Sequence, residues 1–245
     1  MIILLTRERL EKAQKDLSIK INMRAKELGL SNERILPVTD GVASIPDYLE
    51  ASHRVMWVLK EPWEKEENGK LRGGWDIWDA WEDIEKPWKI PTWKRMIYIS
   101  HGILNGKTWF EMVDIRDDPK MQEVLNKIAY INISKMPANT TTNYKDLQAH
   151  YKIWRDILME QIHVYSPDII IFGNTFDFFK EDLVGKDTEP DIREDGFIHV
   201  YKKGNTKYFD AYHPNNRIKG MTDELYVNTI IKPCFDIPLD LHKKI

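Results

Sequence analysis

The sequence predicts an α/β protein with three layers, α/β/α, around a central, mostly parallel sheet of four strands. Four short apolar runs have the length of strands, and they cover residues 54–59, 128–133, 168–172 and 207–212. Helix-like sequence separates at least some of these runs, and strand–helix–strand order builds parallel sheets. The first run is almost wholly apolar, as expected of a strand that helices cover on both faces. A chain of 245 residues suits a single α/β domain.

The first half of the chain predicts short elements joined by long loops. A helix is expected over residues 6–29, because the segment is rich in Glu, Lys, Arg, Leu and Ala and has Gly29 at its end. Further helical segments are expected over 46–51, 75–84, 94–104 and 119–127, with loops over 31–45 and 64–74. Pro62 prevents the first strand from continuing. Prolines 87 and 91 are expected to interrupt the chain.

The second half has clearer periodicity. A long helix is expected over 144–165, since apolar residues recur there at three- and four-residue steps: Leu147, Tyr151, Trp154, Leu158 and Ile162. Shorter helices are expected over 175–183 and 222–231. Two apolar arms, 197–201 and 207–212, surround Lys202-Lys203-Gly204-Asn205 and predict a hairpin.

The domain organisation follows from these elements. We expect one domain over 1–245, with an N-terminal helical extension over 1–50 and a Trp-rich insertion or lid over 64–106. The insertion is longer than a connection between two parallel strands needs, and long loops often carry function. Most of its tryptophans are expected to pack, and one or two are candidates for stacking on a flat ligand.

Composition excludes several classes of protein. The lone cysteine, Cys234, excludes a disulfide framework, a thiolate zinc site and an iron–sulfur cluster built from this chain. No apolar run approaches bilayer length, and the opening run 1–5 is too short for a signal peptide. We therefore expect a cytoplasmic monomer with no membrane contact. The net charge of −3 counts mildly against a nucleic-acid partner, although a local basic face suffices to bind phosphates.

Polar residues stand at or just beyond the ends of the apolar runs. They are Glu61, Asn132, Asn174 and His213. The carboxyl ends of parallel strands face one crevice, so these side chains are expected to converge from distant parts of the chain. A carboxylate, two amides and an imidazole at one crevice make a candidate active site.

Four segments resemble the motifs of the uracil-DNA glycosylase superfamily, in order, over residues 54–232. Leu59-Lys-Glu-Pro-Trp63 resembles the first active-site motif, and Ala129-Tyr-Ile-Asn132 resembles the strand that ends in a base-reading asparagine. The segment 170–175 is similar to a later strand, and His213-Pro214-Asn215 resembles the His-Pro-Ser motif. The sequence departs from the pattern at Leu59, where the family has glycine. It also departs at Glu61, Trp63, Asn215 and Asn216.

The resemblance implies a DNA glycosylase that hydrolyses the N-glycosidic bond of uracil or another damaged base, without metal or cofactor. Glu61 would stabilise the sugar cation and orient water, and His213 would donate a hydrogen bond to the departing base. The implied substrate-binding residues are Asn132, Trp63, Trp75, Pro62 and Asn174. The implied DNA-binding residues are Asn215, Asn216, Arg217, Lys219, Ser134 and Lys135. The partner would be DNA, single- or double-stranded, with a damaged base.

Two other interpretations stay open. The same fold would serve a catalytically inactive nucleic-acid- or nucleotide-binding protein. A different hydrolase, acting on nucleosides or glycosides, would pair Glu61 with a second carboxylate such as Glu64 or Asp210. Each residue also has a purely structural interpretation: Glu61 as a surface carboxylate, Asn132 and Asn174 as caps, and His213 as a structural histidine.

Overall fold

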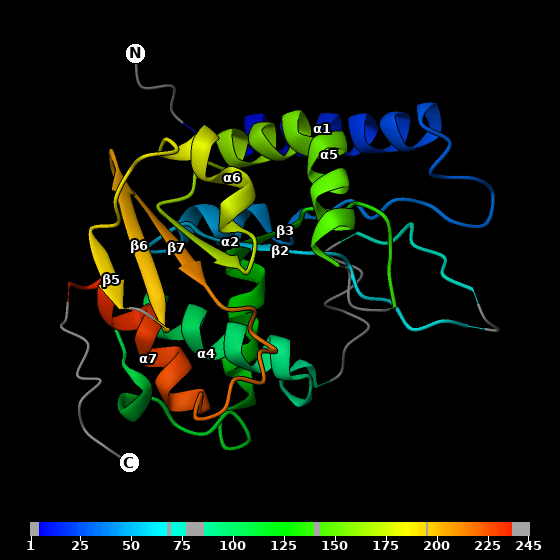
Figure 1. Cartoon of the computed structure of the whole chain (residues 1–245). Coiled ribbons are helices and arrows are strands. Elements are labelled where there is room, and N and C mark those ends of the chain that lie inside the picture. Colours follow the sequence, from blue (N-terminus) through cyan, green and yellow to red (C-terminus); the bar gives the residue numbers. More distant parts are fainter. Residues whose placement is uncertain (1–4, 68–69, 77–85, 140–142, 195, 237–245) are drawn as a thin grey trace.

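A mixed seven-stranded sheet organises the part of the chain that the structure, a computed structural model, describes: residues 5–67, 70–76, 86–139, 143–194 and 196–236. The strand order is β1-β3-β2-β4-β7-β6-β5. The strands are β1 (Gly41–Val42), β2 (Val55–Leu59), β3 (Ile128–Asn132), β4 (Ile169–Gly173), β5 (Ile192–Glu194), β6 (Ile198–Lys203) and β7 (Thr206–Ala211). Figure 1 shows the sheet between two layers of helices.

The α/β class is confirmed, but the predicted four strands are too few. Parallel pairs join β3 to β2, β2 to β4, and β4 to β7. Antiparallel pairs add β1 beside β3 at one edge, and β6 and then β5 beyond β7 at the other. The described sheet is therefore mixed rather than mostly parallel. β6 is the first arm of the predicted hairpin. β1 lies in the predicted loop over 31–45, and β5 lies in a segment for which no element is predicted.

The helices lie close to their predicted positions. They are α1 (Arg7–Glu27), α2 (Ile45–Glu50), α4 (Pro91–Asn105), α5 (Tyr144–Tyr165), α6 (Phe176–Leu183) and α7 (Asp223–Cys234). Three 3₁₀ segments cover Pro87–Lys89, Trp109–Glu111 and Pro119–Lys127, and the last matches the helical segment predicted over 119–127. Pro91 begins α4 rather than breaking the chain, because the first helical position needs no backbone N–H. The helix predicted over 75–84 falls almost entirely outside the described residues.

Two hydrophobic cores lie on opposite faces of the sheet. One includes residues of α1, α5 and α6, and the other includes residues of α4 and α7. Figure 1 shows α1, α5 and α6 on one side of the strands and α4 and α7 on the other. Met56 and Val58 of β2 enter the first core, and Trp57 and Leu59 enter the second. This alternation of side chains, with both faces covered, explains the continuous apolar runs.

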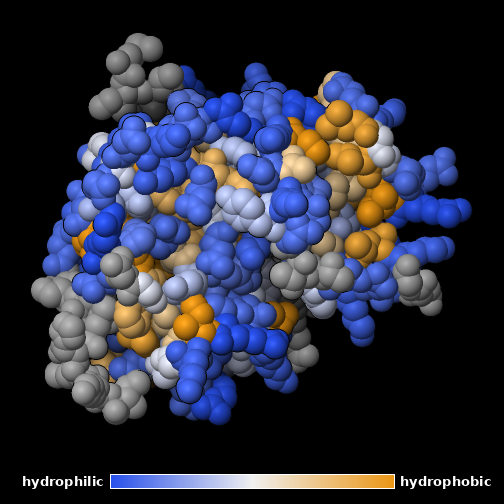
Figure 2. Space-filling model, in the orientation of Figure 1, coloured by the Kyte–Doolittle hydropathy of each residue, from blue (hydrophilic) through white to orange (hydrophobic). Residues whose placement is uncertain are grey.

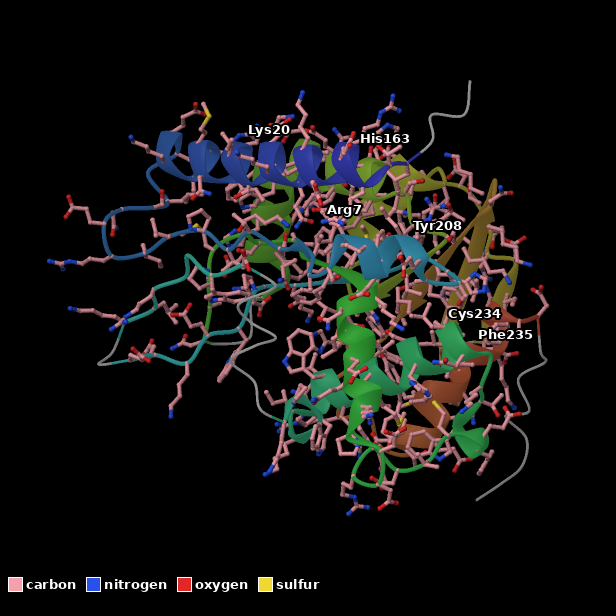
Figure 3. The ribbon with its side chains drawn as sticks, turned by 180° about the vertical axis from the view of Figure 1, so that it is seen from behind. Arg7, Lys20, His163, Tyr208, Cys234 and Phe235 are labelled. Atoms are coloured by element: carbon pink, nitrogen blue, oxygen red, sulfur yellow. The ribbon has the colours of Figure 1, made fainter. Side chains whose placement is uncertain are left out.

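The first 50 residues form part of this layered structure. Thr6 caps α1 by accepting a hydrogen bond from Arg9 N, and Arg24 joins α1 to Asp156 of α5 at 2.8 Å. Seen from behind, Lys20 of α1 and His163 of α5 are labelled on the outer helices, and Cys234 lies at the end of α7 (Figure 3).

Hydrophilic residues cover most of the face in Figure 2, with smaller hydrophobic patches between them. Among the described residues, no helix is long and apolar enough to cross a membrane.

Candidate active site at the carboxyl ends of the parallel strands

The predicted site residues follow adjacent strands in space. Asn132 ends β3, Glu61 follows β2, Asn174 follows β4 and His213 follows β7. The four strands are parallel, so all four residues stand at the same edge of the sheet. Neighbouring strands lie about 5 Å apart, which sets the backbones after β2 and β7 about 10 Å apart across β4.

Close backbone approach holds three of these strand ends together. A Cβ atom on Gly173 would lie 2.5 Å from Leu59 Cδ2, 3.2 Å from Pro214 Cδ and 3.4 Å from His213 Cα. The Asn174 backbone N–H donates to Ala211 O at 2.8 Å. Glycine at 173 therefore lets the segment that carries His213 cross the end of β4 at contact distance.

Replacing Gly173 with alanine is expected to lower the free energy of unfolding by about 1–3 kcal/mol, because the added methyl overpacks this crossing. Urea unfolding measures the loss. Leu59→Ala in the same chain vacates the nearest atom, so the double variant should lose less stability than the sum of the two single variants. Additive losses would contradict the contact.

The structure gives His213 the electrostatics of a neutral hydrogen-bond donor. Burial, together with the nearby charge of Lys60, lowers the pKa of His213 to about 4. The ring is therefore uncharged at neutral pH. Its Nδ1 accepts the Asn215 backbone N–H at 3.1 Å. In the neutral ring the proton must then reside on Nε2, which remains able to donate.

Lys60→Gln is expected to raise the pKa of His213 by up to about one unit, because it removes one of the two effects that lower this pKa. The unfolded pKa is about 6.5, so the folded chain binds fewer protons than the unfolded chain between that value and the folded pKa. Stability should therefore fall as the pH drops through this window, and the total loss should be smaller in the variant because its window is narrower. NMR titration of the imidazole measures the shift. Lys65→Gln, at an exposed position, is the control.

Glu61 is half-buried after β2, close to two groups from different elements. Its charge acts on the Tyr130 hydroxyl of β3 and on His150 of α5. Burial lowers the pKa of His150, and the charges of Asp146 and Glu61 oppose that effect. The His150 Nδ1 atom is buried and has no hydrogen-bond partner among the described residues. Sequence reasoning missed this second imidazole because it lies within a helix and not at a strand end.

Asn132 does not present its amide to the crevice. The side chain is fully buried, and its Oδ1 accepts the Tyr130 hydroxyl at 3.0 Å. Its backbone N–H donates to Asp40 Oδ2 at 2.6 Å, and its Nδ2 lies 3.5 Å from the same oxygen. The predicted role of reading a base edge would require breaking these bonds. Asn132 instead joins the end of β3 to the loop before β1.

Ser134 and Lys135 are also buried, which corrects their predicted position on a DNA-binding surface. Lys135 Nζ lies 2.6 Å from Asp40 Oδ1, and both side chains are 0% exposed. Gln161 Nε2 donates to the same oxygen at 3.0 Å. The Ser134 hydroxyl exchanges hydrogen bonds with the backbone of Met136. Neither side chain can reach a phosphate in this conformation.

Trp63 and Trp75, the two tryptophans predicted to bind substrate, differ in their surroundings. Trp63 is 65% exposed, and Pro62 before it is buried. Trp75 is half-buried and donates from Nε1 to Glu64 Oε2 at 3.1 Å. Glu64 also accepts two backbone N–H groups of its own loop, from Arg72 and Gly73. Glu64 therefore supports the loop, which weakens its candidacy as a second catalytic carboxylate.

The loop after His213 is bound to α4 through Arg95, and several of its other side chains are exposed. Arg95 of α4 donates to Pro214 O at 2.9 Å and to Met221 O at 3.3 Å, and it pairs with Asp223 at 2.8 Å. Asn216 is half-buried and donates to His213 O through its backbone and side chain. The predicted DNA-binding residues Asn215, Arg217 and Lys219 are exposed.

A cavity of about 280 Å³ lies at this edge of the sheet. Lys60 after β2, Asn174 after β4 and Asp210 of β7 contribute to its wall. The remaining lining comes from α5 and α6: Tyr144, Leu147, Phe176 and Asp177. Sequence reasoning found Asn174 and named Asp210 only as an alternative. It missed Lys60 and Asp177, whose charges no motif identifies.

No family model matches this chain, and no curated protein matches it.

Proposed function

We propose that this chain is a DNA glycosylase with the fold of the uracil-DNA glycosylase superfamily, and that it hydrolyses the N-glycosidic bond of a damaged base. One observation carries the proposal: Glu61 and the neutral His213 follow parallel strands at the same edge of the sheet, the edge at which the cavity lies. Lys60 lines that cavity, and its charge acts on His213. The parallel order β3-β2-β4-β7 supports the proposed fold.

The proposed reaction needs two charges stabilised as they form. As the bond from C1′ to the base nitrogen breaks, its electron pair leaves with the base and the sugar becomes cationic. His213 Nε2–H would donate to the base oxygen that gains negative charge, and no proton transfer is needed at that point. Glu61 would stabilise the cation and accept the proton of the water that bonds to C1′. That proton finally goes to the released base.

The structure also suggests how an extruded base would be held. Tyr144 and Phe176 line the cavity, and the exposed ring of Tyr144 would offset part of the cost of flipping by stacking on the base. Asn174, rather than Asn132, is the amide in that wall. The exposed Arg217 and Lys219 after the histidine remain the proposed contacts to the DNA backbone.

The test is single-turnover release of base from single-stranded DNA that contains uracil or another damaged base. Alkaline cleavage of the product reveals the abasic site. Enzyme-dependent product from the wild-type chain, and none from Glu61→Gln/His213→Ala purified in the same way, would support the proposal. Tight binding without abasic product would instead favour the inactive DNA-binding protein. Two features favour this second candidate: the net charge of −3, and the side chain of Leu59 beside Gly173, at a position where the family has glycine.

A further inference from the structure

The cavity at the strand ends has an acidic wall that the proposed catalytic residues do not explain. Asp210 projects from β7, and Asp177 lies in the first turn of α6. Both line the same cavity of about 280 Å³. The described residues that line it include no arginine. The other lining residues are Lys60, Asn174, Tyr144, Leu147 and Phe176. The ring of Phe176 is buried against Phe172 and Tyr201, whereas Tyr144 is exposed.

The two carboxylates are close enough to influence each other. The charge of Asp177 raises the pKa of Asp210, second only to burial, and the charges of His199 and Lys180 act in the opposite direction. His199 Nδ1 lies 3.5 Å from Asp210 Oδ2, so this carboxylate is supported from β6 behind it. Asp177 lines the same cavity and is exposed. The wall therefore offers hydrogen-bond acceptors with a net negative charge.

Nucleobases differ in how they fit such a wall. Uracil and hypoxanthine present carbonyl oxygens where cytosine and adenine present amino groups. A carboxylate accepts hydrogen bonds and cannot donate them, so it attracts an amino group and repels a carbonyl oxygen. A rejected base also leaves the carboxylates desolvated without a donor, which adds to the discrimination.

We propose that this cavity selects bases that carry an exocyclic amino group, with Asp177 and Asp210 accepting from that group and an aromatic ring of the wall against its face. The selection rests on the proposed function, because the base reaches the cavity by leaving the DNA stack. Lys60, on the same wall, balances part of the acidic charge and would pair with the anionic backbone of the extruded nucleotide. Damaged cytosine or adenine derivatives are then the substrate class, ahead of uracil.

The experiment compares two lesions that differ at one position. Single-stranded oligonucleotides carry 5-hydroxycytosine or 5-hydroxyuracil, which have an amino group and a carbonyl oxygen at the same ring position. The wild-type chain should release the amino-bearing base about ten- to a hundredfold faster, the ratio expected for a hydrogen bond to a charged group. Asp210→Asn should reduce this ratio to near one, since an amide can donate to the carbonyl as well as accept. Asp187→Asn, at a surface loop outside the cavity lining, is the matched control and should leave the ratio unchanged.

The outcomes separate this inference from the proposed function. Equal release of both bases, or faster release of 5-hydroxyuracil, would overturn the selection and leave the glycosylase intact. If neither base is released, binding of free cytosine and uracil is measured by calorimetry. Preferential binding of cytosine that Asp210→Asn abolishes would support the acidic cavity while rejecting catalysis. No preference there would overturn the selection together with the proposed activity.

Discussion

Replacing Lys135 with methionine is expected to lower the free energy of unfolding by about 3–5 kcal/mol, the cost of removing one partner of a buried ion pair. Lys135 and Asp40 both have fully buried side chains, and their charged atoms are 2.6 Å apart. Burial lowers the pKa of Lys135, whereas the charge and hydrogen bond of Asp40 raise it. Methionine keeps most of the volume but leaves the Asp40 carboxylate in the interior without a cation. Urea or thermal unfolding of the purified variant measures the loss.

A double-mutant cycle identifies the cause of that loss. Asp40→Asn should also destabilise the chain, because it leaves the buried ammonium group of Lys135 without an anionic partner. The double variant Asp40→Asn/Lys135→Met should lose less than the sum of the two, since neither charge then remains alone. Lys20→Met removes the surface pair with Glu160, whose side chains are 49% and 38% exposed, and should cost less than about 1 kcal/mol. A Lys135→Met loss no larger than this control would contradict the buried pair.

The sequence could predict β2, β3 and β4 because each is an almost continuous apolar run. Val55–Leu59 and Ile169–Gly173 are buried along their whole length, and helices cover both faces. The edge strands lack this signal. β1 spans two residues, and β5 alternates between half-buried and exposed positions. Their pairing depends on the neighbouring strand, which local composition does not reveal.

The candidate site was predictable in position but not in side-chain direction. Parallel strands bring their carboxyl ends together, so Glu61 and His213 could be placed at one edge from the pattern of runs. The orientation of Asn132 depends on Asp40, which lies in a segment that the sequence analysis treats as a loop. The family resemblance implies a DNA-binding surface position for Lys135, but lysine can be fully buried when it is paired, and its partner Asp40 is distant in sequence. Asp177 and Lys60 belong to the cavity only through tertiary packing.

Replacing His213 with alanine is expected to lower the single-turnover rate of base release about 10²–10³-fold, the usual effect of losing one donor to a developing oxyanion. The Asn215 backbone N–H occupies Nδ1, so the ring's remaining donor is Nε2. Because the pKa of His213 is lowered to about 4, the same neutral donor is present across the neutral pH range. The rate contributed by His213 should therefore stay constant from pH 8 down to about pH 5. A rate that rises as the pH falls through 6.5 would indicate a charged imidazole instead.

Glu61→Gln should lower the same rate about 10²–10⁴-fold, because the amide can orient water but cannot accept its proton or balance the sugar cation. The two substitutions act on opposite sides of the bond that breaks, so their separate effects distinguish the two roles. Binding of DNA should change little in either variant if the groups act mainly in the transition state. His163→Ala on the exposed face of α5 and Glu33→Gln in an exposed loop are the matched controls and should retain the wild-type rate (Figure 3). Unchanged rates in Glu61→Gln and His213→Ala would place the chemistry elsewhere on the edge, with His150 and Asp210 as the next groups to replace.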